Sequence, residues 1–177
     1  SAANGVGTWP QFEASNSPCN PNLVIPSSAA MLIGDSSGNG NAAFTLTANS
    51  TLEICGDLHI GAHSKLIIEK GARVILNDGQ IHVHSFGTID QHQDGQIEIE
   101  GSAIIALNGS TSKWEMAGDL ILNGQDSLLI SSEIQGGTGV WEWNAPTSYT
   151  YIGTHGQVAF EGNMYGFGDI IIYADAG

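Results

Sequence analysis

Residues 71–99 read GARVILNDGQIHVHSFGTIDQHQDGQIEI, and a glycine returns every eight residues, at Gly71, Gly79, Gly87 and Gly95. A short apolar-x-apolar segment follows each glycine. The pairs are Val74/Leu76, Ile81/Val83, Ile89 with Gln91 in the second place, and Ile97/Ile99. A step of eight residues is too short for a repeat that contains a helix, but it fits one strand and one tight turn. The stretch therefore predicts a coil wound from strands of about three residues.

Strand signals of this kind continue from Phe44 to about Ile134, and no helical period competes with them. If three strands complete one turn of the coil, residues about 23–24 apart should stack and carry similar side chains. Three such columns are Leu58/Ile81/Ile105, Leu66/Ile89/Trp114 and Val74/Ile97/Leu120. We therefore predict an all-β, three-sided parallel β-helix (β-solenoid), right-handed by the usual rule for parallel crossovers. The alternative is an antiparallel meander in a sandwich or barrel, since turns such as Asn77-Asp78-Gly79 also suit hairpins.

The chain of 177 residues is long enough for one domain with a core, so residues 1–177 are expected to form a single solenoid domain. Residues 1–43 hold four of the five prolines and predict an irregular N-terminal cap. The regular coils are expected at 44–139, and an aromatic-rich C-terminal cap at 140–177. A disulfide between the two cysteines, Cys19 and Cys55, would pin the N-terminal cap onto the first coil.

The charge of the chain argues against two classes of partner. Lys and Arg total 4 against 18 Asp and Glu, for a formal net charge of -14. Such a surface repels nucleic acid and anionic membranes because it offers almost no cation to neutralise phosphates. No stretch approaches the roughly 20 consecutive apolar residues that span a bilayer. We therefore expect neither nucleic-acid binding nor membrane insertion.

The text of the repeat also resembles a known class of proteins. The runs STLEICGDLHIGAHSKLIIEKGARVILNDGQIHVHSFGTI (50–89) and NLVIPSSAAMLIGDSSGNG (22–40) are similar to secreted β-solenoid surface proteins of Bacteroidetes-type bacteria, with their recurring "G-x-L-x-I" units and lead-in strand. The resemblance covers about residues 22–135 and implies an exported surface or adhesion component. It also implies that Ser127, in Asp126-Ser127-Leu128, matches the short O-glycosylation signal of that bacterial group.

The histidines form the most suggestive polar set. His59 and His82 lie 23 residues apart and should face outward on neighbouring rungs, with His84 on the same face. Three imidazoles can converge on one transition metal, with Asp57 assisting. The alternative is a solvated histidine stack in which each protonation affects the next. The remaining histidines, His63, His92 and His155, have no evident partners in the sequence.

The carboxylates are a weaker indication of function than the histidines, and they would point to an enzyme. Asp90 and Glu115 should fall on adjacent rungs of one face, and paired carboxylates are what glycoside hydrolysis needs. The turns between residues 56 and 130 are too short to build a cleft, and Arg73 is the only arginine. We expect the chain not to be an enzyme and to need no cofactor. Calcium at aspartate-containing turns such as Asp78 or Asp94 is a minor alternative.

Several strands are apolar at all three positions, so that their middle residues should point outward. These are Ile67, Ile75, Ile121, Leu129 and Ile171. Repeated outward aliphatic residues indicate a partner surface. The partner is either the chain's own N-terminal segment or another copy of the protein. An incompletely capped solenoid end is also a template for the addition of further strands.

Aromatic residues concentrate after Val140. Trp141 and Trp143, and Tyr149 and Tyr151, each place two rings on one face of a predicted strand. They could form the core of the cap, a subunit interface, or a platform on which sugar rings stack.

These observations together favour a secreted, self-assembling structural subunit of a filament or surface layer, with adhesion as its outcome and an extracellular or cell-surface location. A carbohydrate-binding module that uses the C-terminal aromatic residues, with surface glycans as partners, is the alternative. A polysaccharide-active enzyme comes third.

Overall fold

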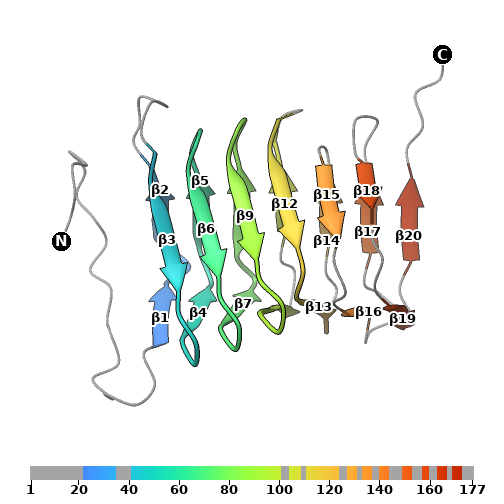
Figure 1. Ribbon diagram of the computed structural model, residues 1–177. Coiled ribbons are helices and arrows are strands. Elements are labelled where there is room, and N and C mark those ends of the chain that lie inside the picture. Colours follow the sequence, from blue (N-terminus) through green and yellow to red (C-terminus); the bar gives the residue numbers. More distant parts are fainter. Residues whose placement is uncertain are drawn as a thin grey trace.

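The structure is a computed structural model that describes residues 22–34, 41–100, 104–108, 111–123, 127–130, 133–136, 140–143, 149–152, 157–159, 163–166 and 169–172. From residue 127 onward, only the strand backbones are described. All regular structure in these residues is β-strand, and successive rungs lie side by side from the blue end to the red end of the chain (Figure 1). Among the described residues there is no helix long and apolar enough to cross a membrane.

The strands form three sheets, A, B and C. Sheet A consists, in spatial order, of β1 (Asn22–Ile25), β4 (Thr51–Ile54), β7 (Arg73–Asn77), β10 (Gln96–Glu100), β13 (Asp119–Leu122), β16 (Val140–Trp143) and β19 (Asn163–Gly166). Sheet B consists of β2 (Ala30–Ile33), β5 (Asp57–Ile60), β8 (Gln80–Val83), β11 (Ile104–Leu107), β14 (Ser127–Ile130), β17 (Tyr149–Ile152) and β20 (Asp169–Ile172). Sheet C consists of β3 (Ala43–Leu46), β6 (Lys65–Ile68), β9 (Thr88–Gln91), β12 (Lys113–Met116), β15 (Glu133–Gly136) and β18 (Gln157–Ala159).

Each strand pairs in parallel with the strand three places later in the chain, as β4 does with β7 and β7 with β10. Three consecutive strands therefore make one turn of a coil, with one strand in each sheet. The three-sided parallel β-solenoid predicted from the sequence is confirmed, and the antiparallel meander is not formed. The strands are mostly four residues long rather than three, because the residue before each apolar pair also joins the ladder.

The register confirms the three predicted columns. Leu58 pairs with Ile81, and Ile81 pairs with Ile105. The other two columns, Leu66/Ile89/Trp114 and Val74/Ile97/Leu120, are also aligned residue by residue. All nine side chains are fully buried. Burying a large aliphatic side chain contributes about 1.5–3 kcal/mol, so stacking such residues on every rung supplies a continuous core along the axis.

The predicted alternation of inward and outward positions is visible in most of the well-described strands. In β5, Leu58 and Ile60 are fully buried, whereas Asp57 and His59 are partly exposed. The second and fourth residues of a strand thus face the core, and the first and third face outward. This rule places His59 and His82, which stand at the third position of their strands, on the outer surface.

The glycines of the eight-residue period serve two different purposes. Gly79, Gly87 and Gly95 stand just before a strand, where the chain passes close to the rung below. A Cβ atom on Gly79 would lie 2.2 Å from the carbonyl oxygen of Ile54, which no side chain could tolerate. Gly71 lies one position earlier in its turn, with φ +75° and no atom within 4 Å of a Cβ placed there. Its role is to adopt the left-handed backbone conformation. The glycines of the period are therefore required for two reasons, space beside the neighbouring rung at three of them and backbone conformation at Gly71.

Left-handed residues recur at the corners of the coil and stack on one another. Asn49, Gly71 and Asp94 occupy successive rungs of one corner, with φ of 65°, 75° and 60°. The Asn49 N–H donates to the Gly71 carbonyl at 3.1 Å, and the Gly71 N–H donates to the Asp94 carbonyl at 2.9 Å. At another corner the His63 N–H donates to the Phe86 carbonyl at 3.1 Å, and both residues have positive φ. These ladders hold the turns at the spacing of the strands.

Candidate functional site

Three histidines gather on the outer face of sheet B. His59 is the third residue of β5 and His82 is the third residue of β8, and the two are in register. Both face outward because their neighbours on either side are fully buried in the core. His84 follows the end of β8 and is exposed. The sequence predicted that these three histidines share one face, and the structure places them together on the outer face of sheet B.

His59 and His82 stack face to face. Their ring centroids lie 4.9 Å apart and their planes are 15° from parallel. This separation is close to the strand spacing of about 4.8 Å, so the parallel register of β5 and β8 alone accounts for the stack.

His59 meets His84 in a different way. The ring centroids are 5.4 Å apart and the planes are 21° from parallel, but Nδ1 of His59 lies only 3.1 Å from Nε2 of His84. Because the two nitrogens are so much closer than the centroids, the rings meet edge to edge, nitrogen facing nitrogen. One of the two nitrogens donates a hydrogen bond and the other accepts it.

His82 uses both of its ring nitrogens elsewhere. Its Nε2 lies 3.1 Å from Oε1 of Gln80, and its Nδ1 lies 3.3 Å from Nδ2 of Asn108. An amide oxygen only accepts and an amide nitrogen only donates, so this arrangement suits the neutral imidazole with its proton on Nε2. The nitrogens of His82 are therefore directed along the sheet and not toward the other two histidines.

The surroundings of His59 lower its pKa from the ordinary value of 6.5. Burial is the largest cause, followed by the charges that His82 and His84 would carry, while Asp57 acts in the opposite direction. Each of the first two causes disfavours the imidazolium form. The surroundings of His59 therefore favour its uncharged form.

The three imidazoles do not converge on one point as the metal hypothesis required. In the part of the chain that the structure describes, no group of three or more His, Cys, Asp or Glu side chains could hold a metal ion. The two aspartates considered for calcium both have positive φ. Asp94 pairs with Lys70 at 2.6 Å, and that contact raises the pKa of the lysine.

A second ring pair has only a weak signal in the sequence. His63 stacks on Phe86, with centroids 4.9 Å apart and planes 16° from parallel. Phe86 is 53% exposed, and it is the exposed large hydrophobic residue among those described. The two residues lie 23 apart, which is the period of the coil. His92, also without an evident partner in the sequence, lies 3.5 Å from Asp90.

The outward aliphatic residues proposed as an assembly surface are distributed over all three sheets. Ile75 and Ile121 lie in sheet A and Ile67 in sheet C. Leu129 and Ile171 lie in sheet B, and the side chains of these two are outside the described residues. In sheet A the third positions of successive strands read Glu53, Ile75, Glu98, Ile121 and Glu142. Acidic residues thus separate the isoleucines on every second rung.

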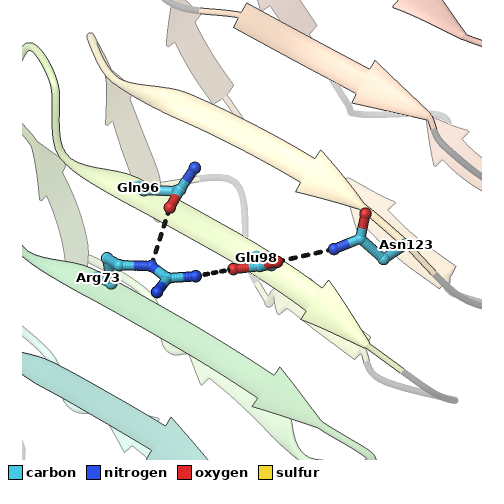
Figure 2. A network of polar contacts seen from close by, with 4 residues as sticks. All are labelled: Arg73, Gln96, Glu98 and Asn123. Atoms are coloured by element: carbon cyan, nitrogen blue, oxygen red, sulfur yellow. Dashed lines mark hydrogen bonds and ion pairs between the residues drawn. The ribbon is translucent and has the colours of Figure 1, made fainter.

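Glu98, in the middle of this sheet A column, is tied to its neighbours (Figure 2). Arg73 on β7 donates from Nε to Oε1 of Gln96 at 2.9 Å and pairs through Nη2 with Glu98. Asn123, which follows β13, donates from Nδ2 to the other oxygen of Glu98 at 2.8 Å. The network crosses three rungs, and the Glu98 side chain is only 16% exposed.

Four further predicted residues can be placed by register alone. Trp141 is aligned with Leu120, which is fully buried, and Trp143 is aligned with Leu122. Tyr151 is aligned with Leu129, in the outward column that contains His59 and His82, whereas Tyr149 is aligned with Ser127, in the outward column that contains Asp57 and Gln80. The register thus separates the tryptophan pair from the tyrosine pair. The side chains of all four, and that of Ser127, lie outside the described residues.

Cys55 is a free thiol in the structure. Its Sγ lies 3.8 Å from Oε1 of Glu53, and burial, followed by the charge of Glu53, raises its pKa. Cys19 lies outside the described residues, so the expected disulfide is not part of the described structure.

No protein-family model, curated protein or solved structure matches this chain.

Proposed function

We propose that this protein is a structural subunit that assembles end to end, coil upon coil, into an extracellular filament or surface layer. The observation that carries the proposal is the state of the end strands. Among the described residues, β1, β2 and β3 at one end and β18, β19 and β20 at the other each have a strand partner on one side only. Such edges are templates for pairing with another chain.

The end strands also lack the charges that usually protect an edge. They read NLVI, AMLI and AFTL at one end and QVA, NMYG and DIII at the other, with Asp169 as the only charged residue. Inner strands, by contrast, carry charges such as Glu53, Arg73 and Glu98. Proteins that must stay monomeric place lysine or other charges on their edge strands. This pattern supports joining at the ends of the coil.

The sides of the coil support lateral association less well. The isoleucines of sheet A are separated by glutamates, and the net charge of the chain is -14. Three of the four cations are already paired within the chain, as Lys65–Asp90, Lys70–Asp94 and Arg73–Glu98. Lateral contact between two copies would therefore bring acidic surfaces together.

The backbone hydrogen bonds show which N–H groups would be available to pair with another copy at the end of the coil. The Ile25 carbonyl accepts from the Cys55 N–H at 2.8 Å, and the Ile33 carbonyl accepts from the Gly61 N–H at 2.9 Å. Alternate residues of a parallel strand bond to opposite neighbours, so the N–H groups of Val24 and Leu32 point to the open edges of β1 and β2. Pairing them with β19 and β20 of another copy would extend sheets A and B.

The test is electron microscopy of the purified protein and of a variant carrying both Val24→Pro and Leu32→Pro. Proline is tolerated where the missing N–H faces the open side of an edge strand, so the variant should keep the circular dichroism spectrum of the wild type. The wild type should form ordered polymers, and the proline variant should remain monomeric.

The matched control carries Val24→Ala and Leu32→Ala, which shortens the same side chains but keeps the N–H donors. This variant should still polymerise. A wild type that stays a monodisperse monomer at high concentration, or a folded proline variant that polymerises as well as the wild type, would overturn the proposal.

A further inference from the structure

The edge-to-edge contact between His59 and His84 presents two ring nitrogens to each other with little else between them. Nδ1 of His59 and Nε2 of His84 are 3.1 Å apart, and their rings are nearly coplanar. The lone pair of an imidazole nitrogen lies in the plane of its ring. In this arrangement the two lone pairs therefore point along one line, toward the same proton.

A metal ion that replaced this proton would be bound from two opposite directions. Metal–imidazole nitrogen distances are about 2.0–2.1 Å, so the two nitrogens would need to separate by roughly 1 Å from their present distance. His84 can supply this movement because it is exposed and lies beyond the end of β8. His59 is held in place by its strand, because β5 is paired on one side with β2 and on the other with β8.

Linear coordination by two neutral imidazoles selects a particular class of ion. Zinc sites have four ligands, and those of calcium have six to eight. The described residues offer no group of three such ligands, and the nitrogens of His82 are already bound to Gln80 and Asn108. Monovalent ions with a filled d shell, Cu⁺ and Ag⁺, accept two nitrogen ligands in line. We propose that Nδ1 of His59 and Nε2 of His84 form a two-coordinate site for Cu⁺.

The local charges favour such an ion. Asp57, two residues before His59 on the same outward face, lies close enough to influence its protonation, and the net charge of the chain is -14. A cation is therefore attracted to this face.

The experiment uses Ag⁺, which is stable in air, as the probe in isothermal titration calorimetry of the full chain. Thiolates bind soft ions strongly, so every protein in the series carries Cys19→Ser and Cys55→Ser. This parent protein should bind one equivalent of Ag⁺ at neutral pH. His59→Ala and His84→Ala should each weaken that binding by at least about tenfold, as even the loss of an outer-shell partner can do at metal sites.

His82→Ala is the matched control, because it removes the third imidazole of the cluster but neither proposed ligand. It should bind Ag⁺ within a few-fold of the parent. X-ray absorption of the Cu⁺-loaded parent, prepared without oxygen, should show two nitrogen ligands. Ag⁺ binding that survives His84→Ala, an equal loss in His82→Ala, or Zn²⁺ bound as tightly as Ag⁺ would each overturn the proposal. Since His84 is exposed, its variant keeps the test valid even if His59→Ala fails to fold.

Discussion

At Gln91 an amide stands in a column that is otherwise apolar, between Ile68 and Met116. The side chain is 1% exposed, and its hydrogen bonds stay inside the coil. Its Nε2 donates to the carbonyls of Gly95 at 2.9 Å and Asp119 at 2.8 Å, and its Oε1 accepts from the indole N–H of Trp114 at 3.0 Å. An inward polar residue is tolerated here because each of its groups finds a partner.

Truncation of Gln91 should therefore be costly. Gln91→Ala leaves a cavity and removes the partner of the buried indole N–H of Trp114, so we expect a loss of about 2–4 kcal/mol in the free energy of unfolding. Urea denaturation followed by tryptophan fluorescence measures it. The control is Gln93→Ala in the adjacent exposed turn, expected within about 0.5 kcal/mol of the wild type. Equal losses in the two variants would contradict a stabilising role for the network.

The lowered pKa of His59 predicts a dependence of stability on pH. The unfolded chain takes up a proton near pH 6.5, while the folded chain resists it until a lower pH. Stability is therefore lost as the pH falls through this value, and is unaffected by His59 above it. Thermal unfolding of the wild type and of His59→Gln should be compared between about pH 5 and 8. The wild type should lose stability relative to the variant on the acid side, and a constant difference would contradict the prediction.

Among the elements, sheet A shows how an outward column can contain isoleucines without forming a continuous apolar surface. Glu98 stands between Ile75 and Ile121, and its carboxylate is held by Arg73 and Asn123 (Figure 2). Each isoleucine is thus bounded by a charged side chain one rung away. The alternation keeps exposed apolar patches small, which limits sideways association.

Replacing the acid should remove this protection. Glu98→Ile would join Ile75 and Ile121 into one apolar column, so we expect the variant to associate through its side. The measurement is sedimentation velocity in a protein that also carries Val24→Pro and Leu32→Pro, which block the proposed end-to-end route. Glu98→Gln in the same background removes the charge without adding apolar surface and should stay monomeric. If both variants associated, the loss of the Glu98 charge, and not the added apolar surface, would be the cause of association.

For the whole molecule, acidic sides and uncharged end strands act in opposite directions. Copies with a net charge of -14 repel one another at a distance, whereas the end strands offer unpaired backbone groups on contact. Salt shortens the range of the repulsion, from a Debye length of about 30 Å at 0.01 M to about 8 Å at 0.15 M. It has little effect on backbone hydrogen bonds at short range.

Polymer growth should therefore accelerate with salt. We expect light scattering of the wild type to rise faster at 0.15 M than at 0.01 M sodium chloride. The proline variant should show no rise at either concentration. Growth that slows as salt is added would contradict end-to-end joining between like-charged subunits, because it would indicate contacts held by opposite charges.

The sequence by itself determined the solenoid, its three sides and the buried columns. Each rung must bury the same two positions per strand. The eight-residue spacing therefore indicates one strand and its turn, and the 23-residue spacing indicates one complete coil. It also brought His59, His82 and His84 to one face. Only the tertiary structure decided which ring nitrogens oppose each other, that Gln91 meets Trp114, and that Phe86 covers His63. Those contacts depend on side-chain rotamers and on left-handed turn residues, whereas spacing specifies only which residues share a column.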